Sequence, residues 1–174
     1  VFNRPQVEKD LQQVFKLGIF EDVRLSLNPA QDARKVDVVV NVVERNTGSI
    51  AAGAGYSSAG GLFGSASYQE QNFLGRNMKL GGEIQIGERE YLLDVNFTDP
   101  WIAGDPSRTS YTVNGIRRQT ISLNYDGGTT PVFLPNGDRP RILRTGGGVT
   151  FNRPNILGDF AGSIGLQYQR INVT

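Results

Sequence analysis

The sequence contains no cysteine and no histidine among its 174 residues. These absences exclude a disulfide framework, a thiol nucleophile, a histidine general base and a Cys/His zinc site. No other nucleophile–base arrangement is evident. We therefore expect no enzyme: no catalytic residues, no cofactor-binding residues and no metal ligands.

Charge of one sign and long apolar runs are also missing. The 18 Lys and Arg residues balance 17 Asp and Glu to a net charge of +1, so no global field directs the chain to nucleic acid. No stretch approaches the ~18 apolar residues that a spanning helix needs. The start, Val1 to Pro5, lacks signal-peptide features and is typical of the interior of a longer chain.

Glycine is scarce at first and abundant later, which predicts a boundary near residue 48. Gly18 is the only glycine in residues 1–47, although the chain has 22 glycines. In this first segment the apolar spacing predicts a helix over 5–17, with Pro5 in its first turn and Gly18 as its C-terminal cap. Alternation predicts strands over 20–27 and 36–44. One helix on one hairpin is typical of the C-terminal part of an α/β domain.

The second segment consists of short runs in which apolar or small residues alternate with polar ones. Such runs predict strands over 48–57, 62–71, 78–87, 90–99, 109–118, 145–152 and 160–170. Two architectures fit this pattern: a soluble antiparallel sandwich or barrel, and a transmembrane β-barrel whose apolar residues face lipid. Glycine fills a sandwich core poorly, and the long polar stretch 122–144 contrasts with short turns elsewhere. Both features favour the membrane barrel.

Several local sequences occur in a fixed order that resembles a known family. They are Leu17 to Val23, the valine-rich run ending at Glu44, Gly48 to Tyr56, Tyr68 to Asn77 and Phe97 to Trp101. This order is similar to the BamA-type outer-membrane assembly and translocation superfamily, in which periplasmic POTRA domains precede a membrane β-barrel. The resemblance is to its cyanobacterial-like branch, which is related to the protein import channel of the chloroplast outer envelope.

The resemblance implies a mostly β fold with two parts. Residues 1–47 would be the C-terminal part of an α/β POTRA domain, and residues 48–174 about the first seven strands of an antiparallel transmembrane β-barrel. The turns 72–77, 100–107 and 154–159 would lie in the periplasm, and the 122–144 loop outside.

Candidate site residues follow from the same interpretation. Strand 48–57 would form a lateral seam able to pair with a client strand, through Ser49, Ile50, Ala51, Ala52, Gly53, Ala54 and Gly55. The lumen-facing residues would be Lys79, Glu83, Gln85, Asp94 and Asn96. Trp101 would be an interfacial anchor, although plain turn packing explains it equally well. An edge presenting Val36, Val38 and Val40 would dock unfolded clients, with scaffold packing as the alternative.

The sequence thus predicts a non-enzymatic factor, without cofactors, that inserts and folds β-barrel precursors in a bacterial outer membrane or chloroplast outer envelope. The expected partners are unfolded precursors or translocating polypeptides, the lipid bilayer and other subunits of an assembly machine, but no nucleic acid. The alternatives are a polypeptide-conducting pore for secretion or plastid import, a passive porin and a soluble β-barrel binding module. The Glu83–Asp94 carboxylates are better explained as hydrated lumen charges than as an acid–base pair.

Overall fold

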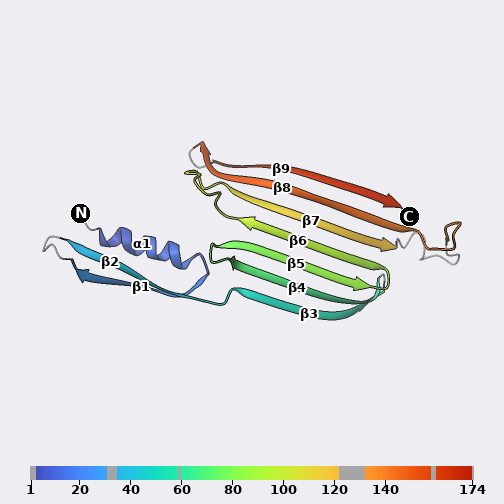
Figure 1. Cartoon of the computed structure of the whole chain (residues 1–174), viewed down its shortest axis with the longest axis horizontal. Coiled ribbons are helices and arrows are strands. Elements are labelled where there is room, and N and C mark those ends of the chain that lie inside the picture. The colour runs from blue at the N-terminus through green and yellow to red at the C-terminus, as the bar shows by residue number, and fades with distance from the viewer. Residues whose placement is uncertain (1–2, 31–34, 59, 122–131, 158–159, 174) are drawn as a thin grey trace. The chain divides into compact units, whose positions relative to one another are not determined.

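The computed structural model describes residues 3–30, 35–58, 60–121, 132–157 and 160–173. The chain forms two compact units, Val1–Thr47 and Gly48–Thr174, each of which is described by itself (Figure 1). Within the described ranges, no helix combines the length and the apolar character required to cross a bilayer.

The first unit is a helix packed beside a two-stranded antiparallel hairpin. Helix α1 spans Arg4–Phe15, and the side chain of Asn3 caps it by accepting a hydrogen bond from the Gln6 N–H. The chain leaves the helix through Gly18, whose φ of 74° is the left-handed conformation expected of a C-terminal cap. Strand β1 spans Phe20–Pro29 and strand β2 spans Val36–Glu44.

The second unit is one antiparallel sheet of seven strands in sequential order. Its strands are β3 (Gly48–Ser57), β4 (Gly61–Phe73), β5 (Met78–Gly87), β6 (Glu90–Asp99), β7 (Ser110–Ile121), β8 (Arg141–Leu157) and β9 (Phe160–Val173). The prediction of about seven antiparallel strands is confirmed. We call the end of the sheet where Gly48 enters the entry end, and the opposite end, with the β5–β6 turn, the far end. The β4–β5 turn and the β6–β7 loop lie at the entry end.

In the described part of the second unit no second layer covers the sheet, so the sheet has no interior core. Among the described residues, the buried nonpolar side chains are Ile19, Met78 and Pro140. Large apolar residues of the sheet are instead exposed, such as Ile50 (81% exposed) and Leu166 (78% exposed). A soluble sandwich would cover such side chains with a second sheet. The single layer therefore favours the membrane barrel.

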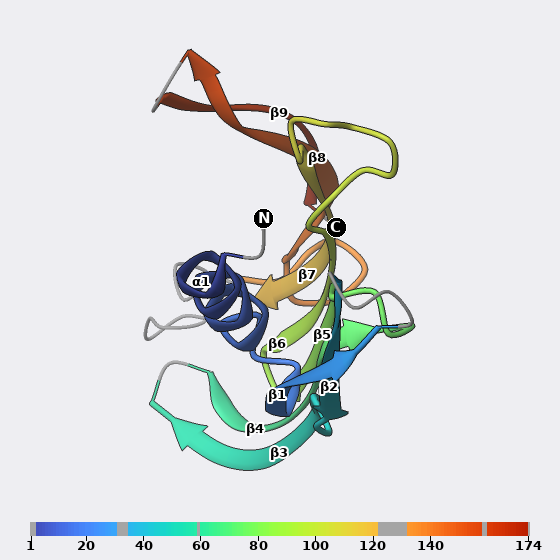
Figure 2. The same ribbon diagram turned by 90° about the vertical axis from the view of Figure 1, so that its left-hand side faces the viewer.

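The sheet curves strongly, and Figure 2 shows β3–β4 and β8–β9 bending to the same side of it. The glycine triplet of β8 permits a close approach of the neighbouring strands. A Cβ atom would lie 2.6 Å from the Tyr168 carbonyl oxygen at Gly146 and 2.9 Å from the Asn114 carbonyl oxygen at Gly147. Only glycine fits such contacts without displacing backbone, and glycines at such positions allow a sheet to bend.

Strand β8 differs most from its prediction, while β1, β4, β7 and β9 differ from theirs by one to three residues at an end. Strand β8 is longer at both ends than the expected 145–152, so residues 154–157 continue the strand where a turn was expected. The pairing with β9 is irregular between Arg153 and Leu157, and a bulge of this kind accommodates Pro154. Residues 122–131 and 158–159, on which parts of the loop predictions fall, lie outside the described residues.

Candidate functional surfaces

The pairing register divides the seven-stranded sheet into a polar face and an apolar face. Directly paired residues share a face, and the pairs Ser67–Glu83, Glu83–Asp94 and Asp94–Ile116 continue across four strands on the polar face. All five residues predicted to face the lumen lie on this polar face: Lys79, Glu83, Gln85, Asp94 and Asn96.

The polar face consists mostly of hydroxyl, amide and charged groups. Thr98 and Thr112 share a hydrogen bond of 3.0 Å between their hydroxyl oxygens. The Asn96 amide packs over Gly81, where a Cβ atom would lie 2.7 Å from its Oδ1. Glu83 and Asp94 are direct register partners, and the described residues contain no cluster of three or more His, Cys, Asp or Glu side chains fit to hold a metal ion. The polar face therefore presents a surface of hydrogen-bonding and charged groups.

The apolar face carries nearly all aromatic residues of the sheet, and most of them fall on two lines that cross the strands obliquely. Phe73 and Phe160 lie nearer the entry end than either line. The outer line, toward the far end, contains Tyr56, Tyr91 and Tyr168. The inner line, toward the entry end, contains Tyr68, Phe97 and Phe151. Phe97 and Phe151 each contact Tyr111, with ring centroids 6.0 and 6.3 Å apart, and Phe97 also contacts Phe73 at 6.5 Å. Phe63 is the exception and lies on the polar face.

The slope of these lines follows from the register. One continuous row of paired residues joins Ala54, Gly64, Ile86, Tyr91, Gln119, Leu143 and Asn172 across all seven strands. Tyr56 lies two residues beyond this row and Tyr168 lies four residues short of it. At about 3.3 Å per residue and 4.8 Å per strand, the outer line falls ~20 Å over ~29 Å, a slope of about 35°.

The inner line has the same slope. Phe151 lies four residues from the row that contains Tyr68, a displacement of ~13 Å along the strands. Four strand spacings, or ~19 Å, separate the two residues across the sheet. Both lines are therefore inclined by about 35°, which matches the strand tilt of about 35–45° in transmembrane barrels. This inclination is the one expected of aromatic residues in a barrel of tilted strands. Tyr91 and Phe97 are six residues apart on β6, ~20 Å along the strand, so the two lines lie ~16 Å apart along the membrane normal, within the ~25 Å apolar band of such barrels.

The free edge of β3 contains the seven residues predicted as a lateral seam, Ser49 to Gly55. Within the described residues β3 pairs with β4 alone, over ten consecutive pairs from Gly48 to Ser57. Most of its side chains are small, and the ring of Phe63 covers Gly55, where a Cβ atom would lie 2.7 Å from the ring. The inner edge of β3 is thus fixed, while its outer edge has no strand beside it in the described chain.

The hairpin of the first unit brings Val36, Val38 and Val40 together on one face. They pair with Pro29, Leu27 and Leu25 in register. Val23 lies on the same face as Leu25 and, with Leu11 and Phe15 of α1, lines a small cavity. The three valine side chains therefore lie on the helix side of the hairpin, and they remain 42–51% exposed. Any partner strand added to the β2 edge would bind backbone groups rather than these side chains.

Trp101 belongs to a compact loop between β6 and β7. Its indole N–H donates a hydrogen bond of 2.7 Å to the Asp105 carbonyl oxygen. The Asp105 carboxylate accepts the backbone N–H groups of Ser107 and Thr109, each at 2.9 Å. Hydrogen bonding from the Thr109 side chain, with these backbone bonds and the Arg153 charge, lowers the pKa of Asp105 below its usual value. The indole thus stabilises its own loop, and 54% of Trp101 is still exposed.

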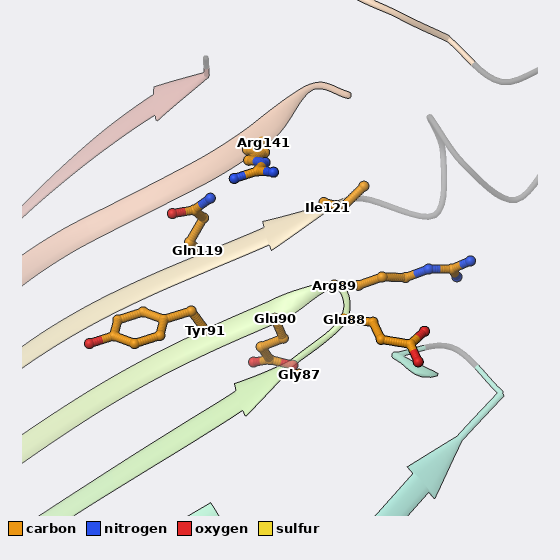
Figure 3. Close-up of a pocket in the computed structure, with 8 residues that line it drawn as sticks. All are labelled: Gly87, Glu88, Arg89, Glu90, Tyr91, Gln119, Ile121 and Arg141. Atoms are coloured by element: carbon orange, nitrogen blue, oxygen red, sulfur yellow. The ribbon is translucent and has the colours of Figure 1, made fainter. Parts of the chain in front are cut away.

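A polar cavity at the far end was not anticipated from the sequence. Its volume is about 350 Å³, and it is lined by Gly87, Glu88, Arg89, Glu90, Tyr91, Gln119, Ile121 and Arg141 (Figure 3). The Glu90 carboxylate lies 2.6 Å from Arg118 Nη2. Sequence reasoning missed the cavity because its residues come from four strands and a turn, and only their register brings them together.

Comparison with known proteins gives consistent results. The model of the Omp85 superfamily domain matches residues 72–174. The chain is 37% identical to "Outer envelope protein 80, chloroplastic" of rice over 97% of its length and 36% identical to the protein of that name from Arabidopsis thaliana, also over 97%. It covers 25% and 23% of these relatives, so it spans about a quarter of their length.

Bacterial proteins are also similar. "Outer membrane protein assembly factor BamA" of Neisseria meningitidis is 27% identical over 66% of this chain and 14% of that protein. The crystal structure of BamA from Haemophilus ducreyi lacking POTRA domains 1–3 superposes with a TM-score of 0.71, covering 97% of this chain and 30% of that chain at 21% identity. This structural similarity establishes the fold, a partial barrel of the BamA type.

Proposed function

This chain belongs to the Omp85 superfamily, and on that premise we propose that it contributes the first barrel strands and a client-binding domain to a factor that inserts and folds β-barrel precursors. Its relatives place it in an outer membrane. The observation that carries the proposal is the free edge of β3, a strand of small residues at the border of a single-layered sheet.

The apolar face contacts lipid and the polar face lines the lumen. The two aromatic lines lie toward the two interfaces on the apolar face, and Trp101 is a further interfacial side chain at the entry end. Lys79, Glu83, Gln85, Asp94 and Asn96 then face water inside the barrel, where charged and amide groups need no protein partner. Several glycine contacts crowd the polar face, at Gly55, Gly81, Gly146 and Gly148, as expected of a concave wall on which side chains converge.

Strand β3 acts as a template for an incoming strand. Its backbone N–H and C=O groups on the outer edge need partners, because unpaired backbone groups are costly in lipid. Ser49 to Gly55 contribute little side-chain packing, so the register of an added strand is weakly fixed and different client sequences fit. The hydrogen bonds and the lipid burial of the client itself supply the free energy, and no nucleotide or cofactor is required.

The first unit binds the client before insertion. Strand addition at the hairpin edge that presents Val36, Val38 and Val40 holds an unfolded precursor in an extended conformation. Recognition through backbone atoms suits partners of varied sequence. The partners are therefore unfolded outer-membrane precursors, with other subunits of an assembly machine.

Site-specific photo-crosslinking in the full-length parent protein tests this function. Crosslinkers replace Ala52 and Ala54 on β3, while Leu93 on β6 provides a control on the same apolar face in an internal strand. Insertion at the seam predicts capture of precursors at Ala52 and Ala54 and none at Leu93. Equal capture at all three positions would show nonspecific contact through lipid and would refute the seam.

The same experiment distinguishes the main alternative, a polypeptide-conducting pore. The polar face carries uncharged polar groups together with charges of both signs, which is compatible with passage of an extended chain. Crosslinkers at Glu83 and Asp94 therefore report on passage through the lumen. A soluble passenger captured there, with β3 silent, would favour secretion or import. Capture at neither place would favour a passive porin.

A further inference from the structure

Charged residues are segregated on the apolar face of the sheet. Every charged residue on this face of the described strands lies on or outside the two aromatic lines. Those near the inner line are Glu70, Asp99 and Arg153. Those at or beyond the outer line are arginines only: Arg117, Arg141 and Arg170.

We propose that Arg117, Arg141 and Arg170 form a binding surface for the phosphate group of anionic lipids in the leaflet at the far end. The proposal rests on the apolar face contacting lipid, as proposed above, and not on precursor insertion.

The three arginines come from three neighbouring strands. Arg117 of β7 and Arg170 of β9 are both paired with Thr145 of β8, so they lie on either side of it in one row. Arg170 lies two residues beyond Tyr168 of the outer line. Arg141 lies four residues beyond Thr145 on β8. Arg117 therefore lies on the outer line, Arg170 two residues beyond it, and Arg141 ~13 Å farther along the strand direction than Arg117. The surface thus extends from the outer line outward into the headgroup region.

The acidic groups near these arginines do not pair with Arg117 or Arg141 in the described part of the chain. Within the described residues, neither Arg117 nor Arg141 forms an ion pair. The Glu90 carboxylate is occupied by Arg118 on the polar face, and the Glu88 carboxylate lies against Gly61. Arg170 donates a hydrogen bond of 3.2 Å to Asn172, which holds its side chain along the strand.

Arg141 also lines the far-end cavity. Figure 3 shows it on β8 beside Gln119 of β7, with Tyr91 on the next strand. A guanidinium group binds phosphate through two parallel N–H···O bonds, and the Gln119 amide beside Arg141 can donate a further bond. Below Arg117 and Arg170, these three strands carry only apolar residues and glycine on this face down to the inner line. A ligand with a phosphate head and hydrocarbon tails fits this arrangement, whereas free phosphate would leave the apolar part uncovered.

Fluorescence quenching by labelled lipids tests the proposal. A cysteine-free form of the full-length protein is reconstituted in phosphatidylcholine vesicles. Thr145→Cys carries a fluorophore between Arg117 and Arg170. Trace phosphatidylglycerol or phosphatidylcholine, each with a nitroxide near the headgroup end of one chain, is the quencher. We expect the phosphatidylglycerol probe to be enriched at this position by about fivefold, the preference that one interfacial arginine supplies. The enrichment should decline as salt is raised.

The triple variant R117Q/R141Q/R170Q should reduce the enrichment to about onefold. R144Q is the matched control, because Arg144 pairs with Arg118 and lies on the polar face at the same end; it should retain the enrichment. Equal quenching by both lipids in the unaltered protein overturns the proposal, as does loss of enrichment in R144Q, which would indicate general charge attraction. Quenching by neither lipid would refute the lipid-facing assignment itself, whatever the crosslinking experiment shows for insertion.

Discussion

The oblique aromatic lines predict how deep individual residues lie in the bilayer. Ile50 and Tyr168 belong to one row of paired residues, which also contains Tyr68 and Val95. If strands ran along the bilayer normal, all members of a row would lie at one depth. With a tilt of about 35°, six strand spacings of 4.8 Å separate Ile50 from Tyr168 by ~16 Å in depth.

A second pair reverses this relation. Tyr91 and Tyr168 lie on different rows, four residues apart along the strand direction, which is ~13 Å without tilt. With the tilt, the sideways displacement across three strands compensates, and the two tyrosines lie within ~3 Å of one depth. The two pairs therefore give opposite results under the two geometries, which makes the comparison decisive.

Nitroxide labels at I50C, Y91C and Y168C in the full-length protein provide the measurement. The accessibility of each label to oxygen and to a polar nickel chelate reports its depth in reconstituted membranes. We expect Y91C and Y168C at the same shallow depth toward the far end, and I50C near the opposite interface. Equal depths for I50C and Y168C, with Y91C displaced, would refute the assignment of the aromatic lines as bilayer interfaces.

Two further predictions concern local structure. Gly146→Val should destabilise the barrel by about 1–3 kcal/mol in a denaturant titration, because a Cβ atom there would lie 2.6 Å from the Tyr168 carbonyl oxygen. The control Gly53→Ala should change stability by less than about 0.5 kcal/mol, because its Cβ atom would meet only Ser65 Oγ at 3.8 Å. Equal effects of the two substitutions would contradict the bend assigned to β8. The pKa of Asp105 is lowered in the folded protein, so its ionised carboxylate stabilises the loop at pH values above the usual pKa of the group. This stabilisation is lost as the pH falls through the lowered pKa of the folded state. Trp101 emission, measured in a single-tryptophan background, should follow that acid transition, and Asp105→Asn should abolish the transition.

Much of the fold could be predicted from local sequence because alternation specifies strands directly. The bounds of β3, β5 and β6 agree with the predicted ranges, as does the bound of β2. The resemblance of short turns such as Asn72 to Asn77 added the family and the barrel. The face shared by Lys79, Glu83 and Asp94 also follows from period-two alternation alone.

The parts that could not be predicted depend on pairing between strands. The resemblance implies a turn over 154–159, whereas residues 154–157 continue β8, where an irregular pairing with β9 accommodates Pro154. The aromatic lines and the arginine surface require the register of all seven strands. A one-residue slip would move Arg117 to the polar face, and no single strand contains that information.

The side chains of β3 bear on where a barrel of this kind opens. Other strands carry bulky residues on the apolar face, as β9 does with Ile164, Leu166 and Tyr168. Bulky side chains of this type pack against a neighbouring strand and fix its register. Strand β3 offers mainly alanine, glycine and serine, so a strand paired to its outer edge gains backbone hydrogen bonds and little side-chain packing. Separating that pairing costs the least side-chain contact, which makes the β3 edge the mechanically weak one and the natural place for a client strand to enter.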